Sequence, residues 1–166
     1  MAKLSEFMEW LQGFGARVPL IQLEEKLGDL DLNLDEIGEH LNFDPARYKR
    51  NLLSEGPGYQ AVILCWLPGQ ESPIHDHPGS SCAVKVLGGV CTEIMYDWAE
   101  DGSLAAHPAV DYPAPGVRGA QDQDMHIVAN RGTEKLVTLH IYTPPLLLMN
   151  TYAPSGEITG SIGVAS

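Results

Sequence analysis

The chain has 166 residues, 44% of them hydrophobic, which suits one globular domain with a single core. Its 22 acidic residues against 10 basic residues give a formal net charge of −12. Nucleic acids and anionic membranes are bound through basic surfaces, so this charge argues against both as partners.

A helical front is expected over residues 1–47. Apolar residues recur at helical spacing from Leu4 to Leu11, and Gly13 ends that pattern. Pro19 is placed to open a second helix that Gly28 would end. A third helix is expected over residues 35–41.

From Tyr48 onward the sequence pattern changes to short apolar runs separated by Gly and Pro turns. This pattern is typical of a small β-sandwich or β-barrel. We expect the β-rich body to span residues 48–153. Residues 99–124 are polar and contain several prolines, so a long surface excursion is expected there. The tail, residues 154–166, is rich in Gly and Ser and is expected to be loosely held.

Compartment and membrane association also follow from composition. No apolar run is long enough to cross a bilayer. The 3 cysteines contain no Cys-x-x-Cys pair, which favours a reducing compartment over a disulfide framework. We therefore expect a single-domain cytoplasmic protein, and we expect it to be a monomer.

Two histidines two residues apart, His75 and His77, form the most informative motif. Residues i and i+2 of a strand point to the same face, so both imidazoles can converge on one metal ion inside a barrel. Neutral imidazole suits Fe(II), Ni, Cu and Zn, so the ligand type alone leaves the metal open. A His-x-His pair alone is also often incidental.

The surrounding residues resemble the two sequence motifs of the cupin family. Gly69, the two histidines and Gly89 fall on the register of the first motif, while Cys82 stands at the position of its metal-binding Glu. The run His126-Ile-Val-Ala-Asn130 matches the His-x-x-x-Asn ending of the second motif. The resemblance implies a mainly β fold, a small jelly-roll-like cupin barrel behind N-terminal helices, with His126 as the third ligand.

Further segments narrow the resemblance to the cysteine dioxygenase family of cupins. They are Tyr-Lys-Arg-Asn-Leu-Leu at 48–53, Ala-Val-Ile-Leu-Cys-Trp at 61–66 and Val-Thr-Leu-His-Ile-Tyr-Thr-Pro-Pro at 137–145. The resemblance implies Fe(II)-dependent oxidation of the thiol of L-cysteine to cysteine sulfinate with O2. It also implies that three histidines hold the iron without a protein carboxylate.

The same resemblance assigns roles around the metal. Arg50 would bind the substrate carboxylate, because a guanidinium can pair with it through two hydrogen bonds, and Tyr48 would assist. Thr138, His140 and Tyr142 alternate on one strand face and would form a hydroxyl–imidazole–phenol chain. Each of these residues also has a purely structural interpretation. Arg50 can be a surface charge, Tyr48 a half-buried strand aromatic, and His140 a core histidine without a catalytic role.

Cys82 has two readings. It can be a small apolar strand residue without a function. In animal members of the family, the Cys five residues after the second ligand forms a thioether with the active-site Tyr, which here pairs Cys82 with Tyr142.

Two other functions remain open at this stage. The chain can be a dioxygenase of another small thiol such as 3-mercaptopropionate, although relatives with that preference commonly carry Gln where this chain has Arg50. It can also be a non-catalytic cupin that binds a metal and a carboxylate ligand.

Overall fold

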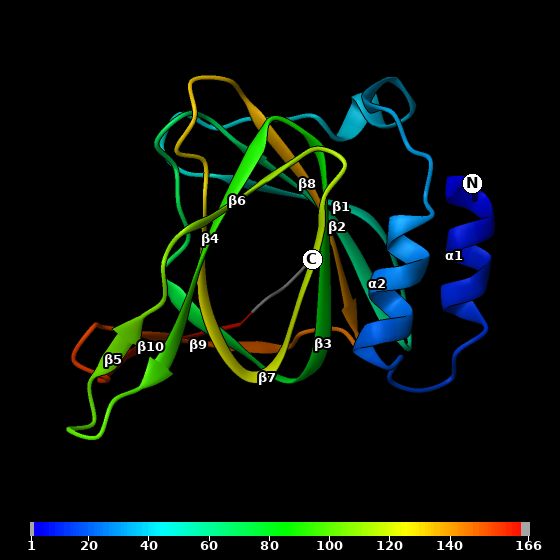
Figure 1. Ribbon diagram of the computed structural model, residues 1–166. Coiled ribbons are helices and arrows are strands. Elements are labelled where there is room, and N and C mark those ends of the chain that lie inside the picture. Colours follow the sequence, from blue (N-terminus) through cyan, green and yellow to red (C-terminus); the bar gives the residue numbers. More distant parts are fainter. Residues whose placement is uncertain (1, 164–166) are drawn as a thin grey trace.

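A computed structural model describes residues 2–163, and its helices lie close to where the sequence predicts them (Figure 1). Helix α1 spans Leu4–Gln12 and is followed by Gly13, and α2 spans Leu20–Gly28 directly after Pro19. The third helix, Leu34–His40, is a 3₁₀ helix in which the Asn33 side chain accepts a hydrogen bond from the Glu36 amide. None of the helices in residues 2–163 is long and apolar enough to cross a membrane.

The rest of residues 2–163 forms a curved antiparallel sheet. Its main path runs β1-β2-β8-β3-β7-β4-β5, with β9 attached to β3, β10 attached to β9, and β6 attached to β4. No ladder within these residues joins β1 to β5, so the cupin fold is a jelly-roll-like sandwich and the expected barrel is open on one side. The strands are β1 Lys49–Gly56, β2 Tyr59–Trp66, β3 Ile74–Gly88, β4 Val90–Trp98, β5 Leu104–Ala106, β6 Val110–Pro113, β7 Val117–Ala129, β8 Leu136–Thr143, β9 Leu148–Tyr152 and β10 Ile158–Gly163.

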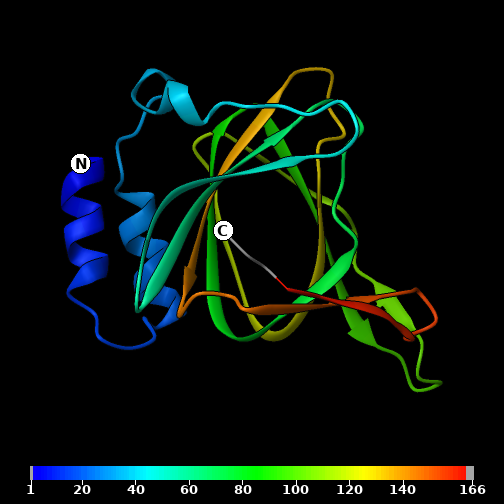
Figure 2. The ribbon, with the colours of Figure 1, turned by 180° about the vertical axis from the view of Figure 1, so that it is seen from behind.

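Strands β2 and β8 are buried on both faces, which explains their nearly continuous apolar sequences. On one face, Ile63, Leu139 and Ile141 share a core with α1 and α2. Both views show α2 between α1 and the sheet (Figure 1, Figure 2). On the opposite face, Trp66 and Tyr142 belong to a second core inside the sandwich. Because successive side chains of a strand point to opposite faces, Leu139 and Ile141 face the helices and Tyr142 faces the interior of the sandwich.

Two glycines lie at close approaches between elements. Gly119 lies where α2 approaches β7, and a Cβ there would be 2.7 Å from the ends of the Leu20 and Glu24 side chains, which would have to move. Gly89 connects β3 to β4 with φ of +83°, and a Cβ there would lie 2.5 Å from the Lys135 carbonyl oxygen. The second glycine is the last residue of the cupin-like first motif.

The prediction of a surface excursion over residues 99–124 is wrong. This segment contains β5, β6 and the first half of β7, and β7 pairs with β3 in the middle of the sheet. The polar composition of the first half of β7 is typical of a loop, so the sequence pattern did not indicate a strand. The strand is stable because its polar side chains have partners within the fold. Arg17, for example, makes two hydrogen bonds of 2.8 Å to the Asp122 carboxylate.

The prediction of a loosely held tail is also wrong for residues 158–163. These residues form β10, which pairs with β9 through a ladder from Ile158 to Gly163. Backbone hydrogen bonds hold this strand, so its Gly- and Ser-rich composition gave no sign of it. Residues 164–166 of the expected tail lie outside the described residues.

Candidate metal and substrate site

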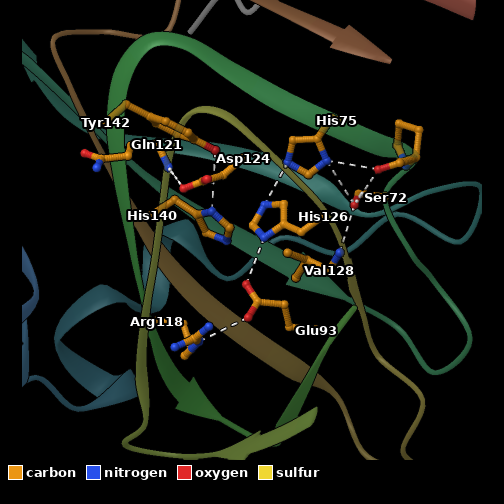
Figure 3. A network of polar contacts seen from close by, with 11 residues as sticks. Ser72, His75, Glu93, Arg118, Gln121, Asp124, His126, Val128, His140 and Tyr142 are labelled. Carbon is orange, nitrogen blue, oxygen red and sulfur yellow. Dashed lines mark hydrogen bonds and ion pairs between the residues drawn. The ribbon is translucent and has the colours of Figure 1, made fainter. Parts of the chain in front are cut away.

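Three buried histidines meet inside the sandwich. His75 and His77 come from the start of β3, and His126 comes from β7, directly opposite His75 in the ladder. Each offers one ring nitrogen, and these three atoms lie within 4.8 Å of one another. The structure therefore brings together the three residues predicted as metal ligands (Figure 3).

In two of these histidines, the ring nitrogen that points away from the shared centre, Nδ1, already makes a hydrogen bond. His75 Nδ1 donates to the Pro73 carbonyl oxygen at 2.9 Å, and His126 Nδ1 donates to Glu93 Oε2 at 2.8 Å. Since both acceptors can only accept, both Nδ1 atoms carry a proton. The Nε2 atoms of His75 and His126 then face each other at 3.2 Å.

That Nε2 pair has the chemistry of a cation site. Burial, together with the neighbouring His126, lowers the pKa of His75 to about 3, so its Nε2 carries a lone pair at neutral pH. Burial likewise holds the pKa of His77 well below its ordinary value. Two nitrogens in this arrangement need a proton or a metal ion between them, and neutral imidazoles bind metals of the first transition series. The donor set therefore fits a divalent metal ion.

A second polar chain lies beside the histidines on β8. Trp66 Nε1 donates to Thr138 Oγ1 at 3.0 Å, and Thr138 Oγ1 shares a hydrogen bond of 2.8 Å with His140 Nε2. His140 Nδ1 shares a further hydrogen bond of 3.4 Å with Tyr142 Oη. Figure 3 shows His140 and Tyr142 beside His126. In the tautomer in which Thr138 donates to His140 Nε2, His140 Nδ1 donates to Tyr142, and that order of donors leaves the phenol proton of Tyr142 free for another acceptor.

The protonation states of this chain agree with that order. Burial, with the charge of Arg50, holds the pKa of His140 well below its ordinary value. Burial raises the pKa of Tyr142 above the ordinary range of a phenol. At neutral pH, His140 is neutral and Tyr142 is a hydrogen-bond donor.

Arg50 connects this chain to a cleft at the surface. Its Nη1 lies 3.5 Å from Tyr142 Oη, and its guanidinium lies 5.6 Å from the centre of the Tyr142 ring. Its Nη2 is buried and has no hydrogen-bond partner among the described residues. The cleft has a volume of about 420 Å³ and is lined by Asp44, Arg47, Tyr48, Lys49, Arg50, Met149, Ile162 and Gly163.

Tyr48 stacks on Trp66 behind the cleft. Their ring centroids lie 4.2 Å apart, and Tyr48 lines the cleft. Trp66 belongs to the inner core, where its indole N–H donates to Thr138.

Cys82 and Tyr142 are directly opposite each other in the ladder between β3 and β8. Both are buried, and burial raises the pKa of the Cys82 thiol to about 12. Side chains directly opposite on neighbouring strands lie on the same face at short range. The other two cysteines, Cys65 and Cys91, are buried strand residues.

Sequence reasoning missed two carboxylates beside the histidines. Glu93 on β4 accepts the His126 hydrogen bond, and Asp76 lies between His75 and His77 in the chain. Burial opposes ionisation of Glu93, but hydrogen bonds from His126 and Arg118 more than offset it and lower the pKa of Glu93. A lone Glu within the apolar strand sequence 90–96 was the available signal.

Known proteins match this arrangement in sequence and in fold. Residues 21–155 match the family described as cysteine dioxygenase type I. The cysteine dioxygenase type 1 of Rattus norvegicus is 34% identical over 136 residues, which cover 79% of this chain and 68% of that protein. The Danio rerio protein of the same name is 36% identical over 116 residues, covering 66% of this chain and 58% of that one.

Solved structures show the same fold at lower sequence identity. A Klebsiella pneumoniae protein with a double-stranded β-helix domain superposes with a TM-score of 0.59 at 17% identity, covering 73% of this chain and 89% of that one. A Lactobacillus farciminis oxalate decarboxylase superposes with a TM-score of 0.56 at 18% identity, covering 69% of this chain and 34% of that one. The fold comes from these structures and the family from the sequence matches: the chain belongs to the cysteine dioxygenase type I family of thiol dioxygenases.

Proposed function

We propose that this enzyme oxidises the thiol of L-cysteine to a sulfinate with O2, using an Fe(II) ion held by His75, His77 and His126. The observation that carries the proposal is a guanidinium nitrogen of Arg50 that is buried without a hydrogen-bond partner among the described residues. Arg50 lines the cleft, and its charge contributes to the lowered pKa of His75 and of His140. A thiol without a carboxylate, such as cysteamine, does not need this cation, whereas L-cysteine needs it for its carboxylate, as 3-mercaptopropionate also does. Family membership supports the thiol dioxygenase activity.

The bound metal would supply coordination positions for the thiol and O2, and it would carry the redox step. The protein supplies orientation and charge. Arg50 would pair with the substrate carboxylate through its free Nη2, and Tyr48 on the same cleft wall would add a hydroxyl. This pairing would place the substrate thiol toward the histidines.

The Thr138–His140–Tyr142 chain would act on the reacting end of the substrate. With the Thr138 hydroxyl donating to His140 Nε2 and His140 Nδ1 donating to Tyr142, the Tyr142 hydroxyl would donate its proton into the site. A donor held in place costs little reorganisation when charge develops on the substrate. We therefore assign Tyr142 the role of proton donor and His140 and Thr138 the role of orienting it.

The proposed Cys82–Tyr142 thioether would restrict the phenol further. Coupling the thiol to the aromatic ring breaks an S–H and a C–H bond and forms a C–S bond, and the two protons and two electrons released would reduce one O2 to hydrogen peroxide. The bond would improve preorganisation without adding a new catalytic group.

Metal analysis combined with oxygen uptake tests the proposal. Purified protein would be assayed with L-cysteine, cysteamine and 3-mercaptopropionate, and its His126→Ala and His140→Ala variants would be compared. We expect iron in the wild type, a preference for L-cysteine, and loss of iron only in the His126 variant. A preference for 3-mercaptopropionate would move the substrate to the des-amino thiol. Loss of iron in the His140 variant, with full iron in the His126 variant, would mean that the third ligand is wrongly chosen.

A further inference from the structure

Glu93 is a buried carboxylate that accepts hydrogen bonds from two side chains, His126 and Arg118. Its side chain is 6% exposed. Oε2 accepts the proton of His126 Nδ1 at 2.8 Å, and Oε1 accepts the proton of Arg118 Nε at 3.1 Å (Figure 3). Each oxygen therefore has its own donor.

The strand register places Glu93 at this position. On β4, Met95 is directly opposite His126 of β7, and Glu93 lies two residues from Met95 on the same face. Glu93 and His126 are thus diagonal neighbours across the ladder, within reach of a long side chain. Arg118 lies at the other end of β7 and approaches Glu93 from the outer side, where its guanidinium also lies 5.1 Å from the Tyr112 ring centre.

The three histidines differ in what holds their outer nitrogen. His75 Nδ1 donates to a neutral carbonyl group, and His77 Nδ1 is buried without a hydrogen-bond partner among the described residues. Only His126, of the three, donates to a carboxylate. A carboxylate in this position fixes the tautomer and makes the opposite ring nitrogen a stronger donor.

Glu93 also changes the charge of the site. Three neutral imidazoles leave the whole charge of a divalent ion uncompensated, whereas a carboxylate one hydrogen bond behind His126 supplies negative charge without occupying a coordination position. Arg118 neutralises part of that charge. Because its side chain is 41% exposed, Arg118 can be removed without leaving a large cavity, and Glu93 then keeps His126 as a donor while its Oε1 loses one.

We propose that Glu93 is a positioning residue that makes His126 the strongest donor of the three, and that Arg118 limits the negative charge that Glu93 delivers. This inference rests on the proposed function only in taking the three histidines as metal ligands. It does not depend on the identity of the substrate or of the metal.

The test measures Co(II) binding to the metal-free full-length protein, by competition with a chelator and by the absorption bands of the bound ion. Glu93→Ala should weaken Co(II) affinity about 10- to 100-fold, the range for loss of such a partner. Glu93→Gln keeps an acceptor for the His126 proton but loses the charge, so it should weaken affinity less than Glu93→Ala does and shift the absorption bands. Arg118→Met should bind Co(II) more tightly than wild type, and unchanged affinity would remove the proposed role of Arg118.

Opposite signs for the two partners separate this proposal from a purely structural ion pair. If Arg118→Met weakens Co(II) binding as much as Glu93→Ala, the pair is a structural clamp and the proposal is wrong. Wild-type affinity in Glu93→Gln would remove the role of the charge. Glu71→Ala, which breaks an exposed pair with Arg131 at 3.7 Å, is the matched control and should leave affinity unchanged.

Unfolding curves of the metal-free variants guard against misfolding. If Glu93→Ala does not fold, the comparison between Glu93→Gln and Arg118→Met still decides the question. A wild-type protein that binds no Co(II) would instead count against the proposed metal site.

Discussion

Replacing Arg50 with alanine should impair the use of L-cysteine selectively. The variant loses the only guanidinium that reaches both Tyr142 and the cleft among the described residues. A hydrogen bond to a charged group contributes about 1.5–3 kcal/mol. Because 1.36 kcal/mol corresponds to tenfold, one such bond predicts a fall in kcat/KM of about 10- to 150-fold.

The assay is oxygen uptake at a series of L-cysteine concentrations, with cysteamine as a second substrate because it lacks a carboxylate. Arg47→Ala is the matched control, since Arg47 lines the same cleft but is exposed. Equal losses on cysteine and cysteamine in Arg50→Ala would refute carboxylate binding, as would wild-type turnover of cysteamine at the rate of cysteine.

Other variants test the neighbouring contacts. After turnover with iron and cysteine, the intact mass of the wild-type protein should be lower by two hydrogens, and digestion should yield one joined peptide containing Cys82 and Tyr142. The Cys82→Ala variant should stay active. If digestion after many turnovers yields the two peptides only as separate species, the thioether is contradicted. Asp76→Ala should lower the free energy of unfolding by about 1–3 kcal/mol, because half-buried donors lose their buried acceptor. The Asp76 carboxylate accepts from the Asn150 amide at 2.9 Å and from Tyr152 Oη at 2.7 Å, so an unchanged denaturation midpoint would show that these bonds contribute nothing.

Much of the site was predictable because its residues alternate along single strands. The period of two places Thr138, His140 and Tyr142 on one face, and the structure joins them in a hydrogen-bonded chain. The same period brings His75 and His77 together. Each of these groupings is local, so the sequence pattern alone determines it.

The remaining features depend on pairing between distant segments. The polar sequence of residues 117–124 favours a surface loop, but these residues belong to strand β7. Their charged side chains have partners in distant segments, because Asp122 pairs with Arg17 and Arg118 pairs with Glu93. Composition records polarity and does not record the partner that makes a polar strand stable. Likewise, Glu93 reaches His126 only through the register of β4 and β7. The single domain over residues 1–166, the monomeric state and the cytoplasmic location stay predictions.

The fate of isotopically labelled O2 tests the central claim most directly. Iron-loaded protein would oxidise L-cysteine under labelled O2, and the product would be analysed by mass spectrometry. The proposed function predicts cysteine sulfinate in which both new oxygen atoms carry the label, with one O2 consumed for each cysteine. Unlabelled sulfinate oxygen, or cystine and peroxide as the main products, would contradict it.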